Sequence, residues 1–255
     1  MTLLYDAQSL TQRYVTKLFR NPSLFATALI EPLLFLLLFS QLFTNFGTFL
    51  PVGSGGYIAY LLPGIVLLNG MITAPQAGVS MVNDLNSGFL SKMLLTQVRR
   101  PAILLGRLLT DVFVVIAQSV ITIVVALAMG VVISSGLAGA LLLIVTAAFF
   151  ELALSGLFLT VGMLTRKAET ISVLGGVLFF PLIFVSSAMF PSSFFPSWAQ
   201  TISKYNPVSY AADTMRGLVS GGLPLGTLAT AYIMIGAIAL VTFAATLYQF
   251  RKVIS

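Results

Sequence analysis

Two glutamates stand inside long apolar runs, where acidic side chains are the residues best suited to bind a cation or carry a proton. Glu31 lies in LIEPLLFLLLF and Glu151 lies in AFFELALSG. Insertion scales put the cost of an acidic side chain at the centre of a membrane helix at about 2.5–3.5 kcal/mol, so such residues usually face the bundle interior and have partners. For Glu151 two roles stay open: it lines a path for a cationic substrate, or it makes a hydrogen bond between helices. Glu31 has the same alternatives, and we expect it to pair with Arg107 or Arg20.

Other chemistry is sharply restricted, because the chain has no histidine and no cysteine. This excludes disulfides, Cys/His zinc sites and histidine-based catalytic triads. A hydrolase built on Ser155 would lack its usual base. None of the five lysines follows a glycine, so no P-loop is present to hold the phosphates of ATP. Asp111 follows Arg107 by one helical turn, and we expect these two to pair.

The composition is that of an integral membrane protein. The 255 residues are 58% hydrophobic and only 8% charged, with a mean hydropathy of +1.03. A soluble domain has roughly a quarter of its residues charged, so this chain could not cover a surface that faces water. The net charge of +6 could suggest nucleic acid, but the basic residues are placed as membrane topology requires.

A helix needs about 20 apolar residues to cross the hydrocarbon core of a bilayer. Six runs meet this length: 23–45, 57–81, 108–134, 138–163, 170–190 and 227–250, with approximate ends. Alternate connections between them hold nearly all of the basic residues, so the positive-inside rule places both termini in the cytoplasm. No internal repeat is visible, and 1–255 is expected to form a single transmembrane domain.

Two segments outside the predicted spans have the pattern of amphipathic helices. The segment 1–22 puts apolar residues on one face and is expected to lie in the cytoplasmic interface. Within 82–107, the longest cytoplasmic connection, Leu85, Phe89 and Met93 form an apolar face beside polar residues. That face could rest on lipid headgroups or in the groove of a partner protein, and the pattern favours neither.

The segment 191–226 must begin and end on the outer side, because a further crossing would reverse the charge alternation. Pro196 can start a first short helix. Asn206 is a typical N-cap, and Pro207 suits the first position of a second helix that runs to Ser220. Both helices are too short to cross. Together with the interfacial aromatic residues around them, they predict a hairpin that re-enters from the outer face.

Three stretches of the chain resemble the permease subunits of type-2 ABC exporters, the family of daunorubicin-resistance, polysaccharide and lipid exporters. YIAYLLPGIVLLNG at 57–70 is similar to the second span, with its Leu-Pro-Gly. SGFLSKMLLTQVRRPAILLGRLLTD at 87–111 is similar to the cytoplasmic coupling segment, and MFPSSFFPSWAQTISKYNPVSYAADTMRG at 189–217 is similar to the outer signature. The resemblance covers essentially the whole chain. One departure is VNDLNSG, where Asp84 is the only charge and the family often has a charged run before the coupling helix.

The resemblance implies an all-α polytopic membrane protein with six transmembrane helices, an N-terminal interface helix, a cytoplasmic coupling helix and an extracytoplasmic re-entrant hairpin between spans five and six. It also implies a second permease copy, as a homodimer or with a close paralogue, in the plasma (bacterial inner) membrane among its lipids. Two cytoplasmic ATP-binding subunits would complete the complex and bind ATP and magnesium. This chain would bind no cofactor, no metal and no nucleic acid.

The resemblance further implies roles for individual residues. The coupling helix and N-terminal helix would dock the ATPase through Arg13, Lys17, Asp84, Leu85, Phe89, Lys92 and Met93. The outer hairpin would be shaped by Pro191, Pro196, Trp198, Asn206, Pro207 and Arg216. No catalytic residue is expected in this chain.

The function expected from these features is export driven by a separate ATPase subunit, with an amphiphilic drug-like, antibiotic-like or lipid-like cargo. Export of lipid-linked polysaccharide by the same machinery is an alternative. A secondary carrier or channel is more distant, because it would normally show inverted repeats or more intramembrane ionisable groups.

Overall fold

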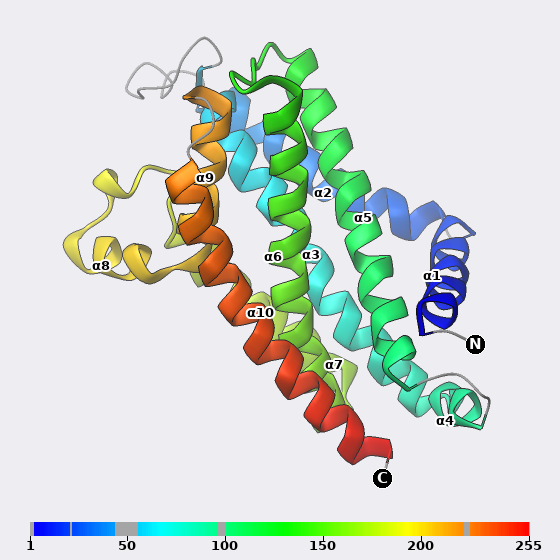
Figure 1. The fold of residues 1–255 in the computed structure, drawn as a ribbon. Helices are drawn as coiled ribbons and strands as arrows, with labels where there is room; N and C mark the ends of the chain where they lie inside the picture. The colour runs from blue at the N-terminus through cyan, green and yellow to red at the C-terminus, as the bar shows by residue number, and fades with distance from the viewer. Residues whose placement is uncertain (1–2, 21, 44–55, 96–99, 222–224, 255) are drawn as a thin grey trace.

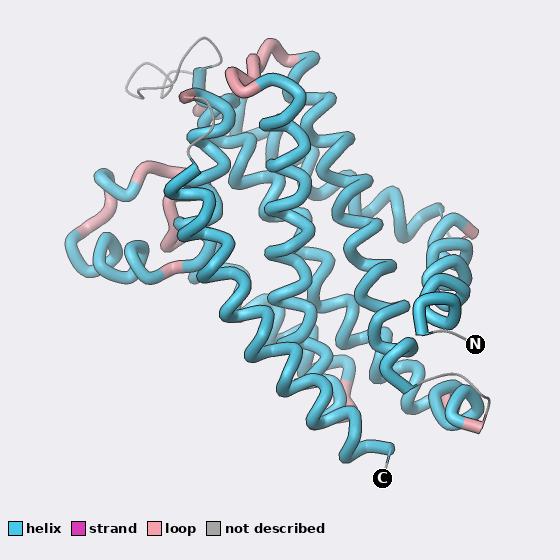
Figure 2. Tube along the Cα trace, in the orientation of Figure 1, coloured by secondary structure: helices cyan, strands magenta, loops and turns pink. Residues whose placement is uncertain are grey.

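The structure is a computed structural model, and it is helical throughout its described part, with short turns and no strand there (Figure 2). The described residues are 3–20, 22–43, 56–95, 100–221 and 225–254. The helices are α1 (Leu3–Phe19), α2 (Pro22–Leu42), α3 (Gly56–Asn86), α4 (Phe89–Leu94), α5 (Arg100–Ala128), α6 (Gly136–Thr165), α7 (Ala168–Phe184), the 3-10 helix η2 (Ser192–Phe194), α8 (Ser197–Tyr205), α9 (Pro207–Ser220) and α10 (Leu225–Ile254). The connection between the first two predicted spans, 23–45 and 57–81, lies outside the described residues, apart from Gly56.

Four helices, α3, α5, α6 and α10, are long and apolar enough to cross a membrane. Two others, α2 and α7, hold the shorter apolar stretches Leu29–Leu42 and Ala168–Phe184. Each of the six apolar runs read from the sequence therefore coincides with a helix. The chain is a multi-pass, all-helical membrane protein, and the number of six crossings stays a prediction.

The predicted third span, 108–134, begins inside α5 but runs past the end of that helix. The helix α5 begins at Arg100, because Pro101 lies in its first turn, where a missing backbone N–H is not needed for an intrahelical hydrogen bond. It ends at Ala128, shortly before Gly130 turns the chain with a φ of 94°. Pro101 thus lies in the first turn of α5, and α5 is separate from α4, which ends at Leu94.

The fifth predicted span, 170–190, is also too long, because α7 ends at Phe184. The carbonyl groups freed at this end accept hydrogen bonds from the side-chain amide of Asn206. The N–O distances are 3.0 Å to Leu182 and 2.9 Å to Val185. A helix that stops inside the bundle therefore still has partners for its last carbonyl groups.

The centre of the bundle is α3, which is buried along most of its length behind α6 (Figure 1). Glycines allow α3 and α6 to approach closely. A methyl group built on Gly78 would lie 2.5 Å from the carbonyl oxygen of Phe158, and one built on Gly162 would lie 3.0 Å from that of Gly78. Membrane helices commonly associate by close approach through small residues. Because lipid tails are as apolar as the side chains, there is little hydrophobic driving force between helices, and close packing has to hold them together.

One end of the bundle gathers α1, α4 and the C-terminus (Figure 1). Leu10 of α1 and Leu90 and Met93 of α4 are buried in one apolar cluster with residues of α5 and α10, including Leu104 and Phe250. A methyl group on Gly106 of α5 would lie 2.7 Å from the Cβ of Leu10. The two short amphipathic helices are thus packed onto the bundle by their apolar faces.

The pair α8 and α9 has the bounds and the cap read from the sequence. The side chain of Asn206 caps α9: it accepts a hydrogen bond of 2.9 Å from the backbone N–H of Val208, the second residue of this helix. Figure 1 shows α8 projecting from the bundle on the side away from α1. The far end of α9 is held by the turn between α5 and α6, where the amide of Ser134 donates to the carbonyl of Val219 over 2.9 Å.

Replacing Gly78 by valine should destabilise the bundle, because its side chain would collide with the backbone of α6 rather than with a flexible side chain. Overpacking of this kind typically costs about 1–3 kcal/mol. Thermal unfolding of the purified chain in detergent should show a clearly lower midpoint. The matched control is Gly176→Val on α7, where a methyl group would meet nothing within 4 Å. Equal midpoints for the two variants would contradict this account of helix packing.

Candidate functional site

The predicted docking residues are brought together at the end of the bundle that holds α1 and α4. The hydroxyl of Tyr14 donates a hydrogen bond of 3.1 Å to the Asp84 carboxylate at the end of α3. The guanidinium carbon of Arg13 lies 4.2 Å from the centre of the Phe89 ring in α4. Burial, reinforced by Asp84, raises the pKa of the Tyr14 phenol, which therefore stays protonated and keeps donating. We name α1, the end of α3 and α4 the docking body.

Not every residue expected there is free to touch a partner. Met93 is only 7% exposed and Leu85 is partly buried, so both help to fix α4 on the bundle. The side chains of Lys17 and Lys92 lie outside the described residues. The sequence reading missed Leu95, which follows α4 and is 89% exposed. Its exposure depends on how α4 packs, which periodicity alone does not show.

Arg107 connects the docking body to the interior of the bundle. Its guanidinium donates to the Asp111 carboxylate over 2.9 Å, as the sequence predicted, and to the carbonyl of Gln76 in α3 over 3.4 Å. It also lies 5.6 Å from the centre of the Tyr14 ring. A single cation thus contacts α1, α3 and its own helix α5.

Glu151 is fully buried between α6 and α3. A methyl group on Gly70 of α3 would lie 3.2 Å from its Cβ, and its carboxylate accepts a hydrogen bond from Ser155 one turn further along α6. Its second oxygen, Oε2, has no hydrogen-bond partner among the described residues. Asp111 is close enough to interact with it electrostatically. Contact of Glu151 with a substrate stays a prediction.

Glu31 lies on the exposed side of α2. Within the described part of the chain it forms no ion pair, because Arg107 is paired with Asp111 and the exposed Arg20 does not reach it. The expected pairing of Glu31 with either arginine is therefore not seen. Glu31 was matched to basic residues expected at the same, cytoplasmic side of the membrane, and the sequence does not show which face α5 presents to α2.

The sequence reading also missed a buried polar contact line between α3 and α5. The Thr73 hydroxyl donates to the Gln118 side chain over 3.1 Å, and the Asn69 amide donates to Thr122 over 3.4 Å. These residues repeat every four positions on each helix, which was the available signal. Polar pairs of this kind hold membrane helices together, at about 0.6 kcal/mol each on average.

At the other end of the bundle, Arg216 joins α9 to α3. Its guanidinium carbon lies 3.7 Å from the centre of the Tyr60 ring, and it donates to the carbonyl of Ser187 over 2.7 Å. It also pairs with Asp213 over 2.6 Å, and Asp213 accepts a second hydrogen bond of 2.6 Å from the Ser187 hydroxyl. Tyr60, Ser187 and Asp213 were not singled out in the sequence, although they form this outer cluster with Arg216.

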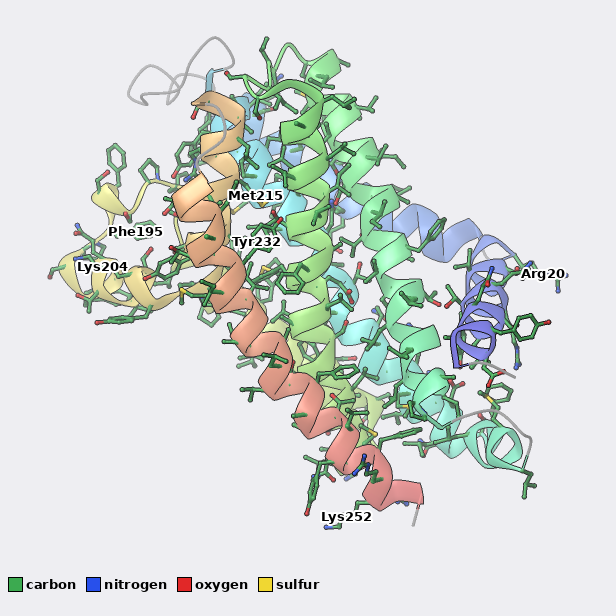
Figure 3. The ribbon with its side chains drawn as sticks, viewed as in Figure 1. Arg20, Phe195, Lys204, Met215, Tyr232 and Lys252 are labelled. Carbon is green, nitrogen blue, oxygen red and sulfur yellow. The ribbon has the colours of Figure 1, made fainter. Side chains whose placement is uncertain are left out.

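The remaining predicted outer residues lie around α8. Pro196 is its N-cap and Trp198 is 62% exposed in its first turn, while Pro191 precedes η2 and Pro207 begins α9. Figure 3 shows Lys204 and Phe195 on this projecting segment, with Arg20 on the opposite side of the molecule and Lys252 at its far end.

Comparison with known proteins agrees with this arrangement. The model of the family described as "ABC-2 type transporter" matches residues 5–220. The daunorubicin resistance ABC transporter permease protein DrrB1 of Streptomyces coeruleorubidus is 27% identical over 192 residues, which cover 75% of this chain and 67% of that protein. The putative transport permease ycf38 of Pyropia yezoensis is 30% identical over 224 residues, covering 86% and 75%.

A further relative is the probable doxorubicin resistance ABC transporter permease protein DrrC of Mycobacterium tuberculosis (strain CDC 1551 / Oshkosh). It is 27% identical over 226 residues, covering 86% of this chain and 79% of that protein. The family match spans most of the chain and confirms the resemblance read from its motifs. This chain is an ABC transporter permease and belongs to the ABC-2 type transporter family.

Proposed function

We propose that this chain is the transmembrane subunit of an ATP-driven exporter that moves an amphiphilic drug-like, antibiotic-like or lipid-like cargo out of the cytoplasm or the inner leaflet. Two relatives bear the names of daunorubicin and doxorubicin resistance, which supports such a cargo. A separate cytoplasmic ATP-binding subunit supplies the energy and holds ATP and magnesium. The chain crosses the plasma or bacterial inner membrane six times, with both termini in the cytoplasm.

The observation that carries this proposal is the docking body. Its two short helices, α1 and α4, are separate from the long apolar helices and are fixed to them by a buried apolar cluster, so a force on α1 or α4 reaches the bundle. Tyr14–Asp84 and Arg13–Phe89 tie α1 to the end of α3 and to α4. A rigid surface of this kind at the basic end of the chain suits a partner in the cytoplasm.

A second permease copy, identical or a close paralogue, and two ATP-binding subunits complete the proposed complex. Support comes from α7, whose residues Val173, Val177 and Phe180 are each more than 60% exposed within one chain. Such an apolar face must be covered by lipid or by another helix. The same apolar surfaces favour an amphiphilic cargo over a lipid-linked polysaccharide, which stays the alternative, and a carrier or channel is more distant.

The function is tested by purifying the tagged chain with candidate ATP-binding subunits from neighbouring genes. Co-purification and ATP hydrolysis that rises with an amphiphilic cargo are the expected results. The proposal fails if no ATP-binding subunit co-purifies and none restores transport in reconstituted vesicles.

Leu95→Asp should break the ATPase contact without unfolding the chain, because the leucine side chain is 89% exposed. We expect co-purification of the ATP-binding subunit to fall about tenfold or more, as for the loss of a central apolar contact in an interface. The matched control is Leu137→Asp, which changes a 77% exposed leucine at the start of α6, at the opposite end of the bundle. If both variants retain the subunit equally well, α4 is not the docking helix.

Glu151→Gln separates the two roles left open for this buried glutamate. The glutamine keeps the shape and can still accept from Ser155, but it removes the charge. Because the carboxylate is buried between α3 and α6, we expect transport of cationic and neutral amphiphiles to stay within about twofold of the parent protein. A selective loss of the cationic compound would instead make Glu151 a substrate contact. Glu169→Gln, an exposed change in the first turn of α7, is the control.

A further inference from the structure

The outer hairpin contains a hollow of about 420 Å³ between η2, the end of α8 and the first turns of α9. Its lining includes the serines Ser192, Ser203 and Ser209 and the tyrosines Tyr205 and Tyr210. The hydroxyls of Ser203 and Ser209 lie 3.1 Å apart and are buried, so this wall is built by the fold. A hollow of this size suits a small polar group, such as a headgroup.

Two opposite charges complete the lining. The Asp213 carboxylate is held through Oδ1 by Ser187 and Arg216, each at 2.6 Å, while its side chain stays 59% exposed. Its other oxygen therefore points to no described partner. Lys204 is exposed at the end of α8, and no described residue forms an ion pair with its ammonium group. The hollow can thus offer one cation and one anion to a single ligand.

The depth of the hollow places it near the headgroup boundary. Val219, near the end of α9, accepts a hydrogen bond from the turn between α5 and α6. Asp213 and Ser209 precede Val219 by 6 and 10 residues, so at 1.5 Å per residue they lie about 9–15 Å along α9 from this turn. The 30 residues of α6 span about 45 Å, and a hydrocarbon core of ~30 Å centred on them would leave about 7 Å at each side. The part of the hollow formed by α9 then lies a few ångströms inside the boundary, and Lys204, which precedes α9, lies deeper.

Aromatic side chains on α8 fit the same depth. Trp198 is 62% exposed and Tyr205 is 79% exposed, and these two residue types are enriched where a membrane meets water. Unpaired charges at this depth are unfavourable against acyl chains, so Lys204 and Asp213 need water or a polar ligand beside them.

We propose that this hollow binds the headgroup of a zwitterionic aminophospholipid from the outer leaflet. The phosphate pairs with the Lys204 ammonium group and accepts from the hydroxyls of Ser192, Tyr205 and Tyr210, which are not buried. The primary ammonium group of an ethanolamine head donates to the free oxygen of Asp213. The site rests on the outer placement of the hairpin proposed above, and its occupant goes beyond the export function.

The lining selects among headgroups. A choline head has no N–H to donate to Asp213 and is bulkier, while a glycerol head leaves the aspartate without a cation. The glycerol head pairs with Lys204 alone and leaves Asp213 unpaired where an unpaired charge is costly, while the choline head brings a positive charge to Asp213 but no hydrogen bond. Ethanolamine phospholipid should therefore be retained in preference to the other two.

The test is the mass spectrum of the intact purified chain, kept in detergent with equal amounts of phosphatidylethanolamine, phosphatidylglycerol and phosphatidylcholine. We expect one ethanolamine lipid per chain to be retained, and about tenfold less retention in Lys204→Gln and in Asp213→Asn. Lys167→Gln and Glu169→Gln, exposed changes at the other end of α7, should retain it fully.

Several outcomes overturn the proposal. Equal retention of the three lipids, or full retention in both Lys204→Gln and Asp213→Asn, would mean that the hollow does not bind the headgroup selectively. Full competition by soluble phosphoethanolamine at matched concentration means a free metabolite rather than a lipid. Because Asp213 also holds Arg216, its variant counts only if the thermal midpoint is unchanged, whereas Lys204→Gln removes no contact described in the fold. The assay uses the permease alone, so a failure of ATPase docking leaves its result intact.

Discussion

Inside a bilayer, backbone groups that leave a helix must find partners within the protein, because no water is there to bind them. This constraint is met by side chains where α7 stops and α9 starts. Asn206 accepts a hydrogen bond at the start of α9 and donates to the last carbonyl groups of α7, so one amide closes two helix ends. Arg216 of α9 donates to the carbonyl of Ser187, in the turn after α7, and packs on the ring of Tyr60 in α3. It therefore holds this turn and α9 against α3. With these groups satisfied, the chain can leave the bundle as α8 and return without crossing.

The same central helix serves both ends of the molecule. Near its start, α3 supports the outer hairpin through Tyr60, and at its other end it meets α1 through Asp84. Between these points it is packed against the backbone of α6 at Gly78, which leaves little room for it to bend or slide independently. A displacement of the docking body is therefore felt by a stiff, buried helix that reaches the outer cluster. This continuity supports the proposal that the permease couples ATP on a partner subunit to the release of cargo at the other end.

Local signals in the sequence were sufficient for much of this arrangement. The Asn206–Pro207 pair correctly predicted the boundary between α8 and α9, since a cap and a first-turn proline act through neighbouring residues only. The pair Arg107–Asp111 was predictable for the same reason. Pro101 acts locally as well, because a proline cannot continue a preceding helix but suits the first turn of the next one, here α5.

Contacts between distant segments were not predictable. The repeat of Leu85, Phe89 and Met93 predicted one helical face, but Gly88, with a φ of 69°, divides it: Leu85 lies in α3 and the other two lie in α4. The repeat also did not show that these residues pack onto the bundle and that Leu95 stays exposed. The pairing of Thr73 with Gln118 needs the register of two helices, which no single-chain pattern supplies. The hollow beside Asp213 arises from three short elements folded together and has no signature in any one of them.

The central claim is that the hairpin and the docking body face opposite sides of the membrane. Because the chain has no cysteine, single cysteines can be introduced without removing others, at the exposed positions Ser197 in α8 and Ser87 beside α4. A membrane-impermeant thiol reagent added to intact cells should label the cysteine at 197, and should label the one at 87 only after permeabilisation. Labelling of both positions from the same side, or in the reverse order, would contradict the account.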